Sequence, residues 1–324
     1  MLARLEEPPF APNPERGGEG IEEKLIKNCI YLTTAQTLTY WICAVASLTF
    51  DASNCVMKRI KSDDYHDWRF TYGKLTVLNV TYSPNYEISW FYQTFCIASV
   101  ASHFTTIDLV TSGVLAHISC QFQILQNNIK RIVKNSKIAM LKETSSEDIP
   151  NAYCIDVDGS KISWKHLHKS LKETVEYHLA ILDITKEMES LYRNLLLLVF
   201  LGTVGMLCFM VYCASLLDIS DTKMIAIAVQ TFTMCVQILL ICYWGEQVIY
   251  ESQQVGNVVL EANFVGTDLR FQKGLVLIMA RSNFPVKLTA GKFTNICLAA
   301  FMWILRTSYS AFMMLRNNNQ RKKM

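Results

Sequence analysis

Long uncharged stretches alternate with polar segments along this chain. Four of them contain no Asp, Glu, Lys or Arg over at least 20 consecutive residues: 28–50, 88–107, 194–217 and 224–245. A fifth apolar stretch, 293–315, is interrupted only by Arg306. Because an α-helix rises about 1.5 Å per residue, each stretch can cross the roughly 30 Å hydrocarbon core of a bilayer. The pattern predicts an all-α integral membrane protein, a polytopic helical bundle with five spans.

The segments between these stretches complete the expected organisation. Apolar residues recur at helical spacing before the third span, and an amphipathic stretch follows the second, so we expect long helices that continue beyond the bilayer. The expected segments are an amino-terminal segment 1–27, span 28–50, loop 51–87, span 88–116, a helical extension and loop 117–193, spans 194–217 and 224–245, a polar region 246–291, span 292–315 and a tail 316–324.

Composition supports the membrane class. Hydrophobic residues make up 51% of the chain and charged residues 18%, which favours a membrane protein over a soluble one. The net charge of +3 is too small to suggest nucleic-acid binding. The 11 cysteines include no C-x-x-C pair and are interpreted as small packing residues. Residues 1–20 lack the apolar core of a signal peptide, so insertion is expected to depend on the first internal span.

Motifs for catalysis are missing from the sequence. It contains no Ser-His-Asp order, glycine-rich phosphate loop or H-E-x-x-H, so we expect no enzyme. His166 and His168 would point about 200° apart on a helix, and no acidic or Cys partner has ligand spacing, so neither a metal nor another cofactor is expected. Asn79 begins the one N-x-[ST] sequon, "NVT", and is a candidate glycosylation site in an external loop.

Several short stretches resemble one family. "CYWGEQVIYES" at 242–252, "LTAGKF" at 288–293 and "SYSAFMMLR" at 308–316 are similar to the sixth and seventh helices of insect odorant receptors. "SPNYE" at 83–87 and "VEYHLAILDITKEME" at 175–189 resemble the corresponding earlier regions of that family. Their order and spacing extend the resemblance over essentially the whole chain from about residue 20.

The resemblance implies a fold and a function. Members of the family are seven-helix proteins with a cytosolic amino terminus and an external carboxyl terminus. They form tetrameric, odorant-gated, nonselective cation channels with a shared co-receptor, in the plasma membrane of sensory neuron dendrites. Small volatile odorants bind in the outer half of the bundle, and the last helix of each subunit lines the pore. On this topology the Asn79 loop lies outside.

One departure from the family concerns the amino terminus. The five spans correspond to the family's third to seventh helices, and residues 1–27 contain no stretch that can supply the first two. The chain is therefore expected to be either a fragment, such as a gene model with a wrong start, or a shortened variant. Because the second helix helps to wall the family's odorant pocket, a chain without it is not expected to bind or gate normally.

Candidate ligand-binding residues lie in the outer parts of three spans. An odorant pocket needs aromatic and aliphatic walls with few polar groups. Each candidate has an alternative role in helix packing, in facing lipid or in an interfacial aromatic belt. The predicted set is Tyr40, Trp41, Val45, Phe91, Phe95, Thr231 and Phe232.

The last span carries the predicted pore. A charge facing lipid near a span's centre costs about 2.5–3.5 kcal/mol on insertion scales, so Arg306 should face protein or water. Four arginines around a cation pore would repel its ions. We therefore predict that the opposite face lines the pore, with Arg306 turned toward neighbouring helices or a lateral water path. Glu246 is predicted to anchor the inner end of the fourth span, as a cap, as the partner of a nearby base or as an interfacial carboxylate. The predicted pore face is Ile304, Ser308, Ala311, Phe312 and Leu315.

Three other functions remain open on sequence grounds. A secondary transporter would show an inverted repeat with broken spans and acidic residues at mid-membrane, and no such repeat is evident. A metabotropic receptor would place the amino terminus outside and needs seven helices. A gustatory receptor would end in a motif that Ser308 and Tyr309 match only in part. A nonfunctional partial receptor is the further alternative within the odorant family.

Overall fold

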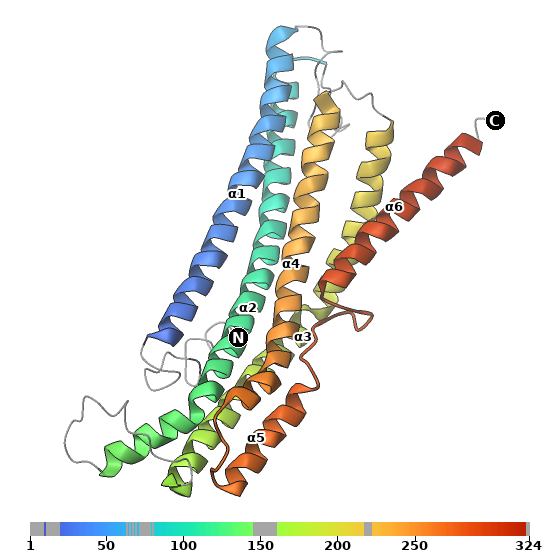
Figure 1. Ribbon diagram of the computed structural model, residues 1–324. Coiled ribbons are helices and arrows are strands. Elements are labelled where there is room, and N and C mark those ends of the chain that lie inside the picture. Colours follow the sequence, from blue (N-terminus) through green and yellow to red (C-terminus); the bar gives the residue numbers. More distant parts are fainter. Residues whose placement is uncertain are drawn as a thin grey trace. The chain divides into compact units, whose positions relative to one another are not determined.

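The computed structural model describes residues 10, 20–62, 64, 66, 68, 70, 79, 81–144, 161–216 and 222–321, without the side chains of 144, 222–223 and 315–321. Much of the predicted 51–87 loop, part of the 117–193 segment and the end of the tail fall outside these residues. The elements, labelled in Figure 1, are helices α1 (Ile21–Lys61), α2 (Asn85–Thr144), α3 (Trp164–Ser215), α4 (Thr222–Glu261), α5 (Leu269–Ser282) and α6 (Leu298–Arg321), and strands β1 (Thr289–Ala290) and β2 (Thr294–Asn295).

The first four helices are longer than the predicted membrane-spanning apolar stretches that they contain. They contain 41, 60, 52 and 40 residues. Helix α2 begins directly after Pro84 and contains no further proline, so no residue removes a backbone donor along its length. The amphipathic extensions expected from the sequence are therefore continuous with the apolar segments, and the chain is mostly helical, as predicted.

Three helices within the described residues are long and apolar enough to cross a membrane. The candidate spans lie in Asn85–Glu143, Trp164–Ser215 and Met224–Glu261. Helix α1 has the length, but its central sequence "TTAQTLTY" at 33–40 lowers its mean hydropathy. Helix α6 likewise mixes apolar residues with Arg306 and several hydroxyl side chains.

The chain divides into two compact units, and unit 1 contains residues 1–33, 112–201 and 239–303. Its core includes Phe122 of α2 and Phe271 of α5, both fully buried. Burial, with a smaller contribution from the charge of Arg281, lowers the pKa of His178 to about 4. This imidazole is therefore neutral at pH 7 and lies edge-on to Phe122, with ring centroids 6.5 Å apart. The polar ring is thus accommodated within an apolar helix face.

A short hairpin precedes α6 in unit 1. Strands β1 and β2 pair antiparallel, with Ala290 opposite Thr294. Gly291 and Lys292 both have positive φ, at 62° and 63°, as tight hairpin turns require. The Gly291 N–H donates to the Arg193 carbonyl of α3 at 3.0 Å, which holds the turn in place. Helix α6 consequently begins at Leu298, later than the expected start of the last span at 292.

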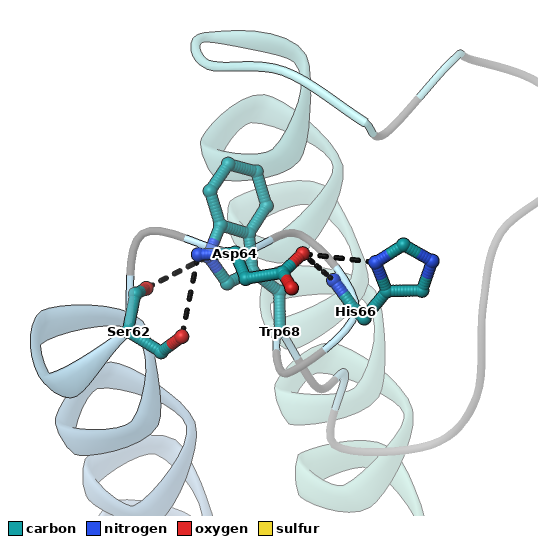
Figure 2. A network of polar contacts seen from close by, with 4 residues as sticks. All are labelled: Ser62, Asp64, His66 and Trp68. Atoms are coloured by element: carbon teal, nitrogen blue, oxygen red, sulfur yellow. Dashed lines mark hydrogen bonds and ion pairs between the residues drawn. The ribbon is translucent and has the colours of Figure 1, made fainter.

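Unit 2 contains residues 34–111, 202–238 and 304–324. After α1, Trp68 Nε1 donates to the Ser62 carbonyl (3.1 Å), and Asp64 Oδ1 accepts from the His66 N–H (3.1 Å), as Figure 2 shows. The Arg59 guanidinium lies 4.1 Å from the centre of the Trp68 ring. The end of α1 and the residues after it thus form one polar and aromatic cluster.

The same cluster reaches the start of α2 within unit 2. Arg59 contacts the Glu87 carboxylate at 3.3 Å, and the ring of Trp68 lies 4.9 Å from that of Tyr86. These contacts connect the last turns of α1 to the first turn of α2.

Candidate functional site

The predicted ligand-binding residues all lie in unit 2, and most of their side chains are exposed in the single chain. Tyr40 is buried, with 7% of its surface exposed, while Trp41, Val45, Phe91, Phe95 and Phe232 are exposed. Thr231 is half-buried, and its Oγ1 donates to the Ile227 carbonyl at 2.8 Å. The structure therefore does not gather the seven residues into one enclosed pocket.

Two of the predicted residues border the same open groove. Phe91 and Phe95 line an open groove of about 500 Å³ together with Glu87, Ile88 and Tyr92. Phe91 and Phe95 are four residues apart on α2 and so lie on one helix face. The volume falls within the range of small-molecule sites, about 300–1,000 Å³. The groove is mostly aromatic, and its one carboxylate, Glu87, is paired with Arg59.

A polar cluster in unit 2 includes residues that the sequence-based site omitted. Gln237 Nε2 of α4 donates to Asp108 Oδ2 of α2 at 3.1 Å. The buried Tyr40 of α1 lies beside Thr105 and near Asp108. Hydrogen bonds between helices in a bilayer contribute on average about 0.6 kcal/mol each. Asp108 directly follows the uncharged stretch 88–107, but its position in the sequence does not reveal that it bonds to Gln237.

The predicted pore face of α6 is largely covered by the chain itself. Ile304, Ser308 and Phe312 are 1%, 4% and 6% exposed, and Ala311 is half-buried. Ser308 Oγ donates to the Ile304 carbonyl at 2.8 Å and contacts the Val204 carbonyl of α3 at 3.4 Å. The side chain of Leu315 lies outside the described residues.

The opposite face of α6 is exposed. Arg306 lies on it, together with Met302, Trp303, Tyr309 and Ser310. The structure thus separates Arg306 from the buried face, as its position on the helix requires. The assignment of the pore to the buried face remains a prediction, and the burial of three of its side chains within one chain weighs against it.

Comparison with known proteins identifies the family. The family described as 7tm Odorant receptor matches residues 21–309. The chain belongs to the insect odorant receptor family. The receptors of this family are not enzymes, and the apolar helices of this chain agree with a membrane receptor.

Curated odorant receptors resemble this chain over part of their length. Odorant receptor 46a, isoform A, of Drosophila melanogaster is 25% identical over 244 residues, which are 74% of this chain and 57% of that protein. Odorant receptor Or2 of Anopheles gambiae is 30% identical over 152 residues, which are 46% of this chain and 39% of that protein. The chain spans roughly half or less of the length of the curated relatives that it matches.

A solved structure shares the fold of this odorant receptor chain. The insect olfactory receptor OR5 from Machilis hrabei, in complex with eugenol, has a TM-score of 0.73 and 14% sequence identity. The likeness covers 92% of this chain and 69% of that one. At this identity it shows the fold alone.

The "WGEQ" segment of this odorant receptor connects α4 to the start of α6 within unit 1. Glu246 Oε2 accepts a hydrogen bond from the Leu298 N–H at 3.2 Å. Leu298 is the first residue of α6, where backbone donors lack partners inside the helix and the helix dipole favours a negative charge. Of the roles considered for Glu246, the geometry is that of a cap.

Proposed function

We propose that this chain is a subunit of an odorant-gated, nonselective cation channel that serves the sense of smell. The observation that carries the proposal is the family match over residues 21–309. The shared fold with an olfactory receptor supports it. The partner would be an odorant co-receptor subunit in a heterotetramer, and the location would be the plasma membrane, by family resemblance in sensory neuron dendrites.

The proposed topology has five spans, with α1 and α6 joining the three most apolar helices. The charge-free stretch of α1 and the apolar run of α6 support their inclusion. In this orientation, 1–27, 117–193 and 246–291 are cytosolic, whereas 51–87 and the tail are external. Helix α6 would then cross the membrane as the pore helix.

Small, mostly apolar volatile molecules are the proposed ligands. The aromatic groove at Phe91 and Phe95 has a suitable volume and few polar atoms. OR5, with the same fold, was solved with eugenol. The remaining candidates, Tyr40, Trp41, Val45, Thr231 and Phe232, stay in the proposed site as residues on the neighbouring helices α1 and α4.

Co-expression with an odorant co-receptor tests the proposed function. A form in which residues 21–324 follow the amino-terminal third of a curated relative is expected to produce odorant-evoked cation currents that the co-receptor alone does not. The second arm is the chain by itself, which spans only part of the length of those relatives. Surface expression of both forms without evoked current to a broad odorant panel would count against the proposal.

Glycosylation of Asn79 tests the proposed orientation. Asn79 is exposed, and its Oδ1 accepts hydrogen bonds from Thr81 N (3.2 Å) and Thr81 Oγ1 (2.7 Å), so both sequon side chains are at the surface. Protein from insect cells is expected to migrate faster on a gel after glycosidase treatment.

The matched variants for this prediction act on the same sequon. Asn79→Gln and Thr81→Ala should abolish the shift, whereas Thr81→Ser should retain it because N-x-S is still an acceptor. An unshifted band for surface-exposed parent protein would contradict an external 51–87 loop.

A further inference from the structure

Two cysteines and a histidine that the proposed function does not use meet in unit 1. Cys29 of α1 and Cys120 of α2 are both buried, at 6% and 5% exposure. Cys29 Sγ lies 3.9 Å from His117 Nδ1. Cys120 follows His117 by three residues on α2, so both project from the same helix face toward α1. The Cys29 side chain is also the main cause of the raised pKa of Cys120, as expected for two thiols that are neighbours on facing helices.

We propose that Cys29 and Cys120 are an oxidisable dithiol, which a peroxide converts into a disulfide linking α1 to α2. Cys29 already contacts His117, and Cys120 lies one turn further along the same face of α2, so a small movement would bring the two sulfurs together. The Cβ atoms of a disulfide lie about 3.5–4.5 Å apart. In a reducing compartment the thiols would stay free, and the bond would form only during oxidation. The pair would therefore be a modification site separate from the odorant site.

The surroundings give the two sulfurs different roles. His117 Nδ1 lies 3.9 Å from Cys29 Sγ and is therefore placed to accept the thiol proton when Cys29 reacts. The thiolate is the reactive form of cysteine. The hydrogen bond with Cys29, burial and the nearby carboxylates of Glu22 and Glu251 raise the pKa of Cys120. Cys29, the thiol that contacts His117, is the attacking sulfur, and Cys120 is the resolving one.

The reaction balances with one molecule of hydrogen peroxide. The Cys29 thiolate attacks a peroxide oxygen, the O–O bond breaks, and the departing hydroxide takes a proton from His117 to become water. Cys29 is then a sulfenic acid. Cys120 attacks the sulfenic sulfur, an S–S bond forms, the S–O bond breaks, and the hydroxide leaves as water with the Cys120 proton. The dithiol gives up two electrons and two protons, and the peroxide yields two waters.

Peptide mapping of the whole chain in membranes tests the pair. Trypsin places Cys29 in peptide 28–58 and Cys120 in peptide 75–130, and a background with Cys43, Cys55 and Cys96 replaced by Ser leaves one thiol in each. After peroxide and alkylation of the remaining thiols, mass spectrometry should find these two peptides linked. Treatment with dithiothreitol should release them.

Matched variants decide whether the link reflects this geometry. In the otherwise native chain, Cys29→Ser is expected to abolish the disulfide between peptides 28–58 and 75–130. Cys43 lies at an exposed position on the same helix, and Cys43→Ser should leave this disulfide intact. Peroxide should also raise the apparent Tm of the native chain by several degrees, and Cys29→Ser should remove that increase. Absence of the link in folded protein with intact thiols, or its loss in Cys43→Ser, would overturn the proposal.

The role of His117 has its own readout. His117→Ala is expected to slow link formation at pH 7 by roughly tenfold and to move the rate profile to higher pH, since less Cys29 is then ionised. Glu22 and Glu251 lie near Cys120 in the parent protein and in His117→Ala alike, so their effect on the rate profile is the same in both proteins. An unchanged rate profile in His117→Ala would exclude a positioning role for this histidine.

Discussion

A Gly245→Ala variant is expected to lose about 1–3 kcal/mol of stability, the typical cost of overpacking a filled interior. A Cβ at position 245 would lie 2.4 Å from the Ile296 carbonyl oxygen and 2.8 Å from its Cγ2. The closest atom belongs to backbone that is held by the hydrogen bond from Ile296 N to the Leu288 carbonyl (2.9 Å), so it cannot turn away as a flexible side chain could. The measurement is the melting temperature of the detergent-solubilised protein, followed by size-exclusion chromatography.

Gly113→Ala is the matched control for this prediction. Gly113 also lies inside a long helix, but a Cβ there would meet no atom within 4 Å. Ala is the better helix former by up to about 1 kcal/mol, so this variant should be neutral or slightly more stable. A Gly245→Ala protein as stable as its parent would show that α4 and the segment before α6 do not pack this closely.

A Ser310→Cys variant is expected to make the odorant-evoked current sensitive to a cationic thiol reagent. At least about half of the current should be blocked. Ser310 is exposed and lies near Arg306 on α6, whereas Ser308 is buried and contacts the Val204 carbonyl. Side chains that line an aqueous path must be reachable from it. We therefore propose that part of the exposed face of α6 lines the conduction path, and expect Ser308→Cys to be protected.

The pair Ser308→Cys and Ser310→Cys forms its own control, because both changes are the same substitution on one helix. The parent channel with its native cysteines sets the background for the reagent. Block at position 308 with no effect at 310 would restore the face predicted from sequence, Ile304, Ser308, Ala311, Phe312 and Leu315. Arg306 would then face neighbouring helices or a lateral water path, as predicted from sequence.

Several features were predictable because they depend on residues close together in the chain. The uncharged stretches and the amphipathic pattern before Asn194 predict long continuous helices. Helices α2 and α3 are continuous in this way. The "WGEQ" and "LTAGKF" segments led to the odorant receptor family, which the family match confirms. In each case local periodicity or a short motif carries the information.

Other features depend on partners distant in sequence. The late start of α6 follows from a hairpin turn at Gly291 and Lys292 that bonds to Arg193 of α3, and no local pattern announces that contact. Arg306 indicates from sequence that the two faces of α6 differ. Only the burial of Ser308 against the Val204 carbonyl shows which of these faces the rest of the chain covers.

The sequence by itself determined the helical membrane class, the family and the approximate positions of the apolar segments, since these follow from composition, hydropathy and local motifs. Only the tertiary structure decided that Glu246 caps α6, that Asp108 bonds Gln237 and that Cys29 meets Cys120 and His117. The physical reason is that a hydrogen bond or a thiol pair requires atoms within a few ångströms, and packing between helices alone brings these atoms together.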